Sequence, residues 1–152
     1  MPADLNNGVY TELINPEAVT YFYNRRHFEV AWLHDSAFAL ADSMVSFIRT
    51  VRLMGLLPQN YHLAELTSLP GLPPDTTLYF RKEALLTDAF LALAFDLKYG
   101  RLRASTNQHE MDSIGSQTLD NALTKNSIRD VLESMEPKHQ PYQLLKNLLR
   151  EM

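Results

Sequence analysis

The stretch LLTDAFLALAFDLKYGRL, residues 85–102, decides the fold class of this chain. When its residues are placed at steps of about 100°, the apolar ones cover two faces of a helix rather than one stripe. A helix that is apolar nearly all round belongs in the buried centre of a domain. The sequence therefore predicts a central helix from about Thr77 to Tyr99, closed by Gly100, with one carboxylate, Asp88, among apolar neighbours.

The composition of the chain is that of one globular domain. It has 152 residues, of which 45% are hydrophobic and 21% are charged, and we expect residues 1–152 to be a fragment of a longer protein. The net charge of -4, with no Lys/Arg cluster, argues against nucleic acid and anionic lipid as partners. There is no cysteine, which excludes thiolate catalysis and Cys-ligated zinc. No export signal is visible, and no apolar run reaches the roughly 20 residues that cross a bilayer.

Further helix signals lie on both sides of the central stretch, and no strand alternation appears. Asn15 and Pro16 supply an N-cap and a first helical position. Apolar residues at helical spacing between Ala37 and Val51 predict a longer helix that ends at Gly55.

The remaining helices are signalled by caps and prolines. They are expected from Pro58 to Leu66, from Ser116 through Leu123, from Ser127 to Pro137 and from Pro141 onward, with SLPGLPPD (68–75) as a rigid connector and RASTNQHEMDSIG (103–115) as a polar interval. The prediction is an all-α domain, a single compact bundle of about six or seven helices around the buried central helix.

Asp88 has two interpretations. As a structural anchor it needs donors, either backbone N–H groups of a neighbouring loop or an arginine such as Arg26, because an unpaired buried carboxylate costs several kcal/mol. As a catalytic acid or base it needs a pKa raised by burial and a second catalytic group nearby. Since the sequence offers no obvious second group, we favour the anchor.

Other site chemistry is weakly signalled. His34-Asp35 followed by Asp88 or Asp96 imitates the ligand set of a metal-dependent phosphohydrolase of the HD type, although Asp35 also suits a helix cap and no two histidines have metal-binding i, i+4 spacing. No Gly-rich phosphate loop, nucleophile elbow or dinucleotide fingerprint is present. An aromatic cluster is expected in the core rather than on a ligand surface: Tyr21, Phe22, Tyr23, Phe28 and Trp32. We therefore predict no catalytic residue, no cofactor and no metal ligand in this chain.

Four segments, taken in order, resemble the helical scaffold domain of the large, multi-domain bacterial L,D-transpeptidases. They are FYNRRHFEVAW (22–32), GLLPQNYHLAEL (55–66), LLTDAFLALAFDLKYGRL (85–102) and LESMEPKHQPYQLLKNLL (132–149). The residues that match the motifs of that family include Tyr23, Arg26, Phe28, Trp32, Gly55, Pro58, Tyr61, His62, Asp88, Tyr99, Gly100, Pro137, His139 and Tyr142. The resemblance extends from about Leu13 to Leu149, with one departure in the interval directly after Arg103, where the family commonly has Asp-Pro and a tryptophan and this chain has ASTNQHEMDSIG.

The resemblance implies a role in peptidoglycan cross-linking and cell-wall remodelling, in the periplasm or cell envelope. In that family the catalytic domain holds a histidine and a Ser/Thr-His-Gly-Cys motif, forms a cysteine acyl-enzyme, and usually accompanies a peptidoglycan-binding module. Neither that motif nor a cysteine occurs here, so acyl transfer by this mechanism is excluded for the chain itself. The implied partners are the catalytic and peptidoglycan-binding domains, with peptidoglycan as a further candidate. The alternatives are an HD-like phosphohydrolase and an unrelated helical protein-interaction domain.

Overall fold

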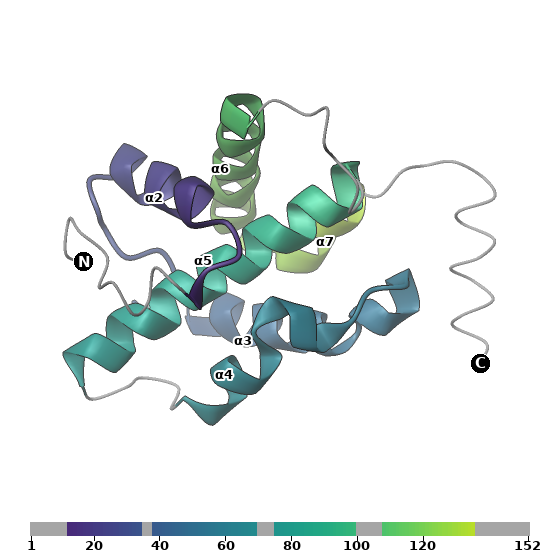
Figure 1. The fold of residues 1–152 in the computed structure, drawn as a ribbon, viewed down its shortest axis with the longest axis horizontal. Helices are drawn as coiled ribbons and strands as arrows, with labels where there is room; N and C mark the ends of the chain where they lie inside the picture. Colours follow the sequence, from purple (N-terminus) through teal and green to yellow (C-terminus); the bar gives the residue numbers. More distant parts are fainter. Residues whose placement is uncertain (1–11, 35–37, 70–74, 100–107, 136–152) are drawn as a thin grey trace.

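The computed structural model of the chain describes residues 12–34, 38–69, 75–99 and 108–135. Within these ranges it has six α-helices and no strand, which confirms the predicted all-α class (Figure 1). The helices are α2 (Pro16–Arg25), α3 (Phe38–Arg49), α4 (Leu63–Ser68), α5 (Thr76–Tyr99), α6 (Gln108–Lys125) and α7 (Ile128–Ser134), with two 3-10 helices, η1 (Val51–Met54) and η2 (Pro58–Tyr61). The helix predicted from Pro141 lies outside the described residues.

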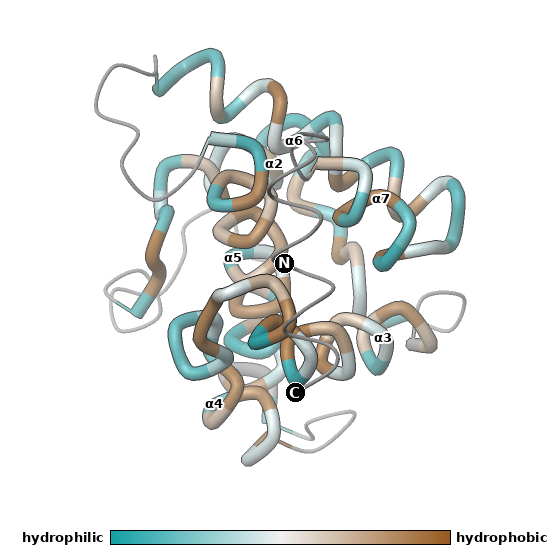
Figure 2. The backbone as a smooth tube through the Cα atoms, turned by 90° about the vertical axis from the view of Figure 1, so that its right-hand side faces the viewer, coloured by the Kyte–Doolittle hydropathy of each residue, from teal (hydrophilic) through white to brown (hydrophobic). Residues whose placement is uncertain are grey.

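Helix α5 is the axis of the fold, as its sequence predicts. Every residue from Lys82 to Phe95 is buried. Helices α2 and α6 pack on α5 and on each other, while α3, α4 and α7 lie on the other side of α5 in the view of Figure 1. Figure 2 shows the largely hydrophobic α5 between α2 above it and α3 and α4 below it. Because other helices cover α5 on more than one side, an apolar surface all round it is stable.

The aromatic residues expected in the core are mostly found there. Phe22, Tyr23 and Trp32 are almost completely buried, and the Trp32 ring lies 6.4 Å from the Phe90 ring, centroid to centroid. Tyr21 and Phe28 are only half-buried.

Two predicted helix boundaries are wrong. The segment from Pro58 to Leu66 is not one helix: η2 ends at Tyr61, and α4 begins at Leu63. The break falls at His62, whose φ of 62° places this non-glycine residue in the left-handed region. The long helix predicted to end at Gly55 is an α-helix only as far as Arg49, and the separate 3-10 helix η1 follows it. Gly55 ends η1 with a φ of +78°, in the left-handed region.

The polar interval predicted at residues 103–115 is wrong in its second half. Helix α6 starts at Gln108, and Ser116, expected to be an N-cap, is instead buried in the middle of the helix. The buried positions of α6 do have helical spacing, but only Met111 and Leu119 are large and apolar, and the others are small or polar: Asp112, Gly115, Ser116, Thr118 and Ala122. Packing against α2 and α5 therefore outweighs a weak local signal.

Gly115 allows α6 to approach α5 closely. A Cβ atom at this position would lie 2.8 Å from the fully buried Phe95 ring and 2.9 Å from Leu91. Gly115→Ala should lower the free energy of unfolding by about 1 kcal/mol, because an overpacking cost of about 2 kcal/mol exceeds the gain of about 1 kcal/mol in helix propensity.

Urea denaturation checks this prediction. The exposed Gln117→Ala on the same helix is the control and should change stability by less than about 0.5 kcal/mol. A Gly115→Ala protein more stable than the wild type would show that the two helices have room to spare.

Candidate functional site at the buried carboxylates of helix α5

Two carboxylates of α5, Glu83 and Asp88, are completely buried. They lie in the part of α5 that packs against residues 12–34, and each accepts hydrogen bonds from that segment. We call Glu83 and Asp88 the buried acid pair. The sequence predicts one buried carboxylate in the central helix, Asp88. The structure shows a second one, Glu83.

Asp88 binds the backbone where the chain enters α2. Its Oδ2 accepts from Ile14 N at 2.8 Å and its Oδ1 from Asn15 N at 2.9 Å. The His62 ring adds a third contact, with Nε2 2.5 Å from Oδ2. Since the carboxylate accepts, Nε2 carries the hydrogen and donates it. Of the two kinds of donor expected for Asp88, the backbone N–H groups are the ones found.

Asn15 therefore does not act as the predicted side-chain cap. Its side chain makes no capping hydrogen bond to α2, although Pro16 does occupy the first helical turn. The contribution of Asn15 is its backbone N–H, which is held by Asp88. The start of α2 is thus fixed by an acceptor from a distant helix rather than by a local cap.

Glu83 binds the backbone after α2. Its Oε1 accepts from Trp32 N at 2.9 Å and from Leu33 N at 3.0 Å, while its Oε2 accepts from Ala31 N at 3.0 Å and from the Tyr23 hydroxyl. Three successive backbone N–H groups converge on one carboxylate. Such an arrangement satisfies a buried charge without any cation.

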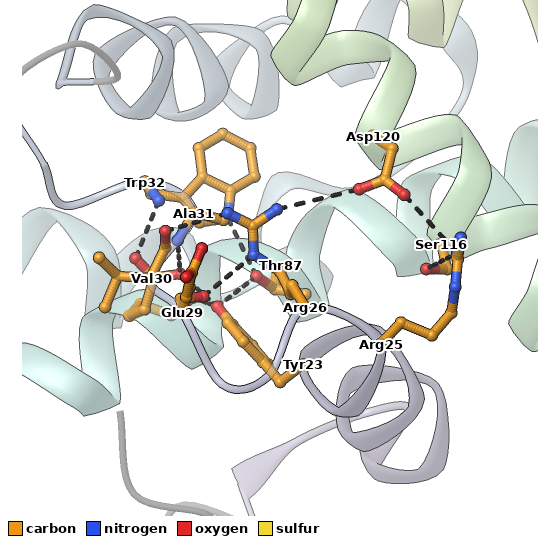
Figure 3. A network of polar contacts seen from close by, with 11 residues as sticks. Tyr23, Arg25, Arg26, Glu29, Val30, Ala31, Trp32, Thr87, Ser116 and Asp120 are labelled. Atoms are coloured by element: carbon orange, nitrogen blue, oxygen red, sulfur yellow. Dashed lines mark hydrogen bonds and ion pairs between the residues drawn. The ribbon is translucent and has the colours of Figure 1, made fainter.

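Thr87 connects the two aromatic residues of this site. Its hydroxyl lies 2.7 Å from the Tyr23 hydroxyl and accepts from Trp32 Nε1 at 2.9 Å (Figure 3). Thr87 stands one helical turn after Glu83, so both side chains point to the same face of α5. Every polar atom of the Tyr23 and Trp32 side chains is therefore satisfied within the core.

Arg26 stabilises the corner that returns the chain to Glu83. The guanidinium donates from Nε to Glu29 O at 3.0 Å and from Nη2 to Val30 O at 3.1 Å (Figure 3). The corner contains two non-glycine residues with positive φ, His27 at 55° and Phe28 at 59°. Arg26 thus binds these carbonyl groups and, at 3.9 Å, the Asp120 carboxylate, so it is not the donor to Asp88 that it would have been under the second alternative.

The remaining predicted residues do not join the buried acid pair. The Tyr61 hydroxyl donates to Asp96 Oδ2 at 2.6 Å, which ties η2 to the end of α5. Tyr99 is half-buried, with Lys98 Nζ 5.7 Å from its ring centroid. Outside the described residues lie Gly100, His139 and Tyr142, together with Asp35 of the His-Asp dipeptide.

Burial and the neighbouring Glu83 carboxylate raise the pKa of Tyr23 well above its ordinary value of 10.0. Desolvation is the larger cause, because the phenolate would have to form in the core. Tyr23 is therefore a neutral hydrogen-bond donor in the folded protein and not an acid that loses its proton near neutral pH.

The raised pKa predicts how stability changes in alkali. Below about pH 10 tyrosine is protonated in both states; above it the unfolded chain ionises while folded Tyr23 does not, so stability falls as pH rises. Between about pH 10 and pH 11 the wild type should lose up to about 1.4 kcal/mol more per pH unit than Tyr23→Phe. Urea denaturation at several pH values measures both slopes. Equal slopes would contradict the assignment.

The arrangement has no opening for a substrate. Both members of the buried acid pair are closed off from solvent, and their oxygens are occupied by backbone and side-chain donors. In the described part of the chain, no group of three His, Cys, Asp or Glu side chains has a geometry that could hold a metal ion. None of the helices described there is long and apolar enough to cross a membrane.

A comparison with protein families agrees with this structural role. A family model described as "Scaffold domain" matches residues 17–149, which include α2 from its second residue and the whole of α3 to α7. No curated protein and no solved structure matches the chain. The match covers most of the 152 residues. The chain therefore belongs to the Scaffold domain family, whose role is that of a non-catalytic scaffold associated with other domains.

Proposed function

We propose that this chain is the non-catalytic scaffold of an exported L,D-transpeptidase-like protein, which acts in peptidoglycan cross-linking and cell-wall remodelling in the periplasm or cell envelope. The scaffold supports or orients a catalytic domain and a peptidoglycan-binding domain of the same parent chain. The observation that carries the proposal is the scaffold-family match over residues 17–149. The four segments that resemble the transpeptidase scaffold fall in the same region, between residues 22 and 149.

The internal polar contacts support a role in fixing geometry. The buried acid pair fastens the backbone before and after α2 to α5, and the exposed Glu12 adds an ion pair with Arg81 of α5 at 2.7 Å. The Tyr79 hydroxyl donates to Leu33 O at 2.5 Å and adds a further link between the same two parts. A domain held this firmly presents its surfaces at constant angles, which is what a scaffold must do for the domains attached to it.

The first test concerns the reading frame that encodes the chain. It should also encode a histidine and a Ser/Thr-His-Gly-Cys motif, because the cysteine nucleophile must come from another domain. A frame without such a motif would contradict the proposal.

The second test is biochemical. The parent protein, incubated with muropeptides that carry tetrapeptide stems, should form 3→3 cross-linked dimers, detected by mass spectrometry, whereas the 152-residue chain should form none. Replacing the motif cysteine by alanine in the parent should abolish dimer formation and leave the scaffold folded. Cross-linking by the chain alone would overturn the proposal.

A further inference from the structure

A shallow groove lies away from the buried acid pair, between the end of α3 and the helices that follow it. Its volume is about 500 Å³, and it is lined by Arg49, Arg52, Pro58, Gln59, Leu63, Ala64 and Thr67. These residues come from α3, η1, η2 and α4, which contact one another. We call this feature the basic groove. No contact of the buried acid pair involves its lining residues, so the role of the pair does not explain it.

The two arginines of the basic groove are not used inside the domain. Both Arg49 and Arg52 are exposed, and among the described residues neither guanidinium has an ion pair or hydrogen bond. Arg25, Arg26, Arg81 and Arg129, in contrast, each pair with a carboxylate. Two unused cations in one groove of a chain with a net charge of -4 attract a negatively charged group.

The basic groove is also partly apolar. Pro58, Leu63 and Ala64 contribute to its lining, and two large apolar residues stand exposed directly beside it in the chain. Leu53, which follows Arg52, is 36% exposed, and Leu57, which precedes Pro58, is 42% exposed. Only one other large apolar side chain among the described residues, Ile14, is as exposed as these. A surface that combines unpaired arginines with exposed apolar side chains offers another protein both charged and apolar contacts.

We infer that the basic groove docks an acidic, leucine-bearing segment of a partner protein domain. The partner's carboxylates bind Arg49 and Arg52, and its apolar side chains cover Leu53 and Leu57. Peptidoglycan stems also bear carboxylates, but they consist largely of alanine and acidic residues and have no bulky apolar side chain for the two leucines. A groove of about 500 Å³ accepts a few side chains and suits one short segment rather than a broad interface.

The experiment uses the 152-residue chain and three fluorescein-labelled probes, measured by fluorescence anisotropy at low and at high salt. The first probe is a glutamate-rich peptide with leucine at helical spacing. The second is the same peptide with each glutamate replaced by glutamine, and the third is a soluble muropeptide with a tetrapeptide stem. The glutamate peptide should bind at least about tenfold more tightly than the other two, and high salt should weaken it.

Two double variants with the same charge change locate the contact. Arg49→Glu/Arg52→Glu should weaken binding of the glutamate peptide by at least about tenfold. The control, Lys98→Glu/Lys125→Glu, also reverses exposed cations in the last turns of helices but lies outside the basic groove, and it should change binding less than about twofold. Circular dichroism should show that both variants remain folded.

A third variant tests the apolar half of the surface. Leu57→Ser should weaken the same peptide by about threefold or more without changing its salt dependence. Equal binding of the glutamine peptide, tighter binding of the muropeptide, or equal loss in the two double variants would each overturn the inference. None of these outcomes bears on the proposed parent enzyme, which the cysteine motif and the cross-linking assay test separately.

Discussion

Replacing Glu83 by alanine should lower the free energy of unfolding by about 3–5 kcal/mol, the loss expected when one side of a buried, charged network is removed. The substitution leaves three backbone N–H groups, those of residues 31–33, without their acceptor in a core closed to water, while the Tyr23 hydroxyl keeps the Glu83 backbone carbonyl at 3.1 Å. A loss of this size is a large fraction of the total stability of a small domain. The variant should therefore be partly unfolded at physiological temperature.

Urea denaturation followed by tryptophan fluorescence measures this effect at the site itself, because Trp32 is the one tryptophan of the chain. Glu133→Ala is the matched control: its carboxylate is only partly buried and pairs with the exposed Arg129, so its loss should cost about 0.5 kcal/mol. A Glu83→Ala protein as stable as the control would mean that residues 31–33 do not depend on this carboxylate.

Asp88→Ala should cost about 2–4 kcal/mol, somewhat less than the loss of Glu83, because it strands two part-buried backbone N–H groups and the His62 ring, whereas Glu83→Ala strands three fully buried backbone N–H groups. Ile14 and Asn15 also lie nearer the outside of the molecule, where water reaches them more easily. The emission of Trp32 in the folded variant should stay at the wild-type wavelength, since Glu83 still binds the backbone around it.

The melting temperature and amide hydrogen exchange check this prediction. The N–H groups of Ile14 and Asn15 should lose protection by more than those of residues 31–33. Asp120→Ala removes an aspartate that pairs with Arg25 and Arg26 at the surface, and it should change stability by less than about 1 kcal/mol. An Asp88→Ala melting temperature equal to that of the wild type would contradict the anchor interpretation.

The central helix could be predicted from the sequence because its apolar residues leave few alternatives. Residues 85–97 contain only two charged side chains, so a helix there has to be buried on nearly every side. The burial of Asp88 and the need for internal donors followed from that one inference. The identity of the donors did not, because Ile14 and Asn15 are 74 and 73 positions away in the chain.

Glu83 was missed for a related reason. In the sequence it follows Arg81 and Lys82, and three successive charged residues at the start of a helix indicate a solvated turn. Its burial depends on the corner at His27 and Phe28, where two non-glycine residues adopt positive φ and turn the chain back. No short-range pattern signals that conformation in residues of this type.

The start of helix α6 is predicted too late in the chain, at Ser116 instead of Gln108, because its first half has few large apolar side chains. Gly115 lies where a Cβ atom would clash with Phe95 and Leu91 of α5, and a glycine inside a polar stretch normally indicates a loop. Only the spacing of Met111, Leu119 and Ala122 marked the helix. The basic groove had no sequence signal, because its residues belong to four elements that meet only in the folded chain.

The buried acid pair also determines when residues 12–34 can fold during synthesis, because their hydrogen-bond acceptors lie later in the chain. The ribosome releases residues 12–34 first, yet their acceptors at positions 83 and 88 appear later by 50 to 74 residues. At about 5–20 residues per second, the early segment waits roughly 3–15 s with its amides still hydrated. Throughout that interval Phe22, Tyr23 and Trp32 have no core to enter, which makes the nascent segment of residues 12–34 a natural client of chaperones.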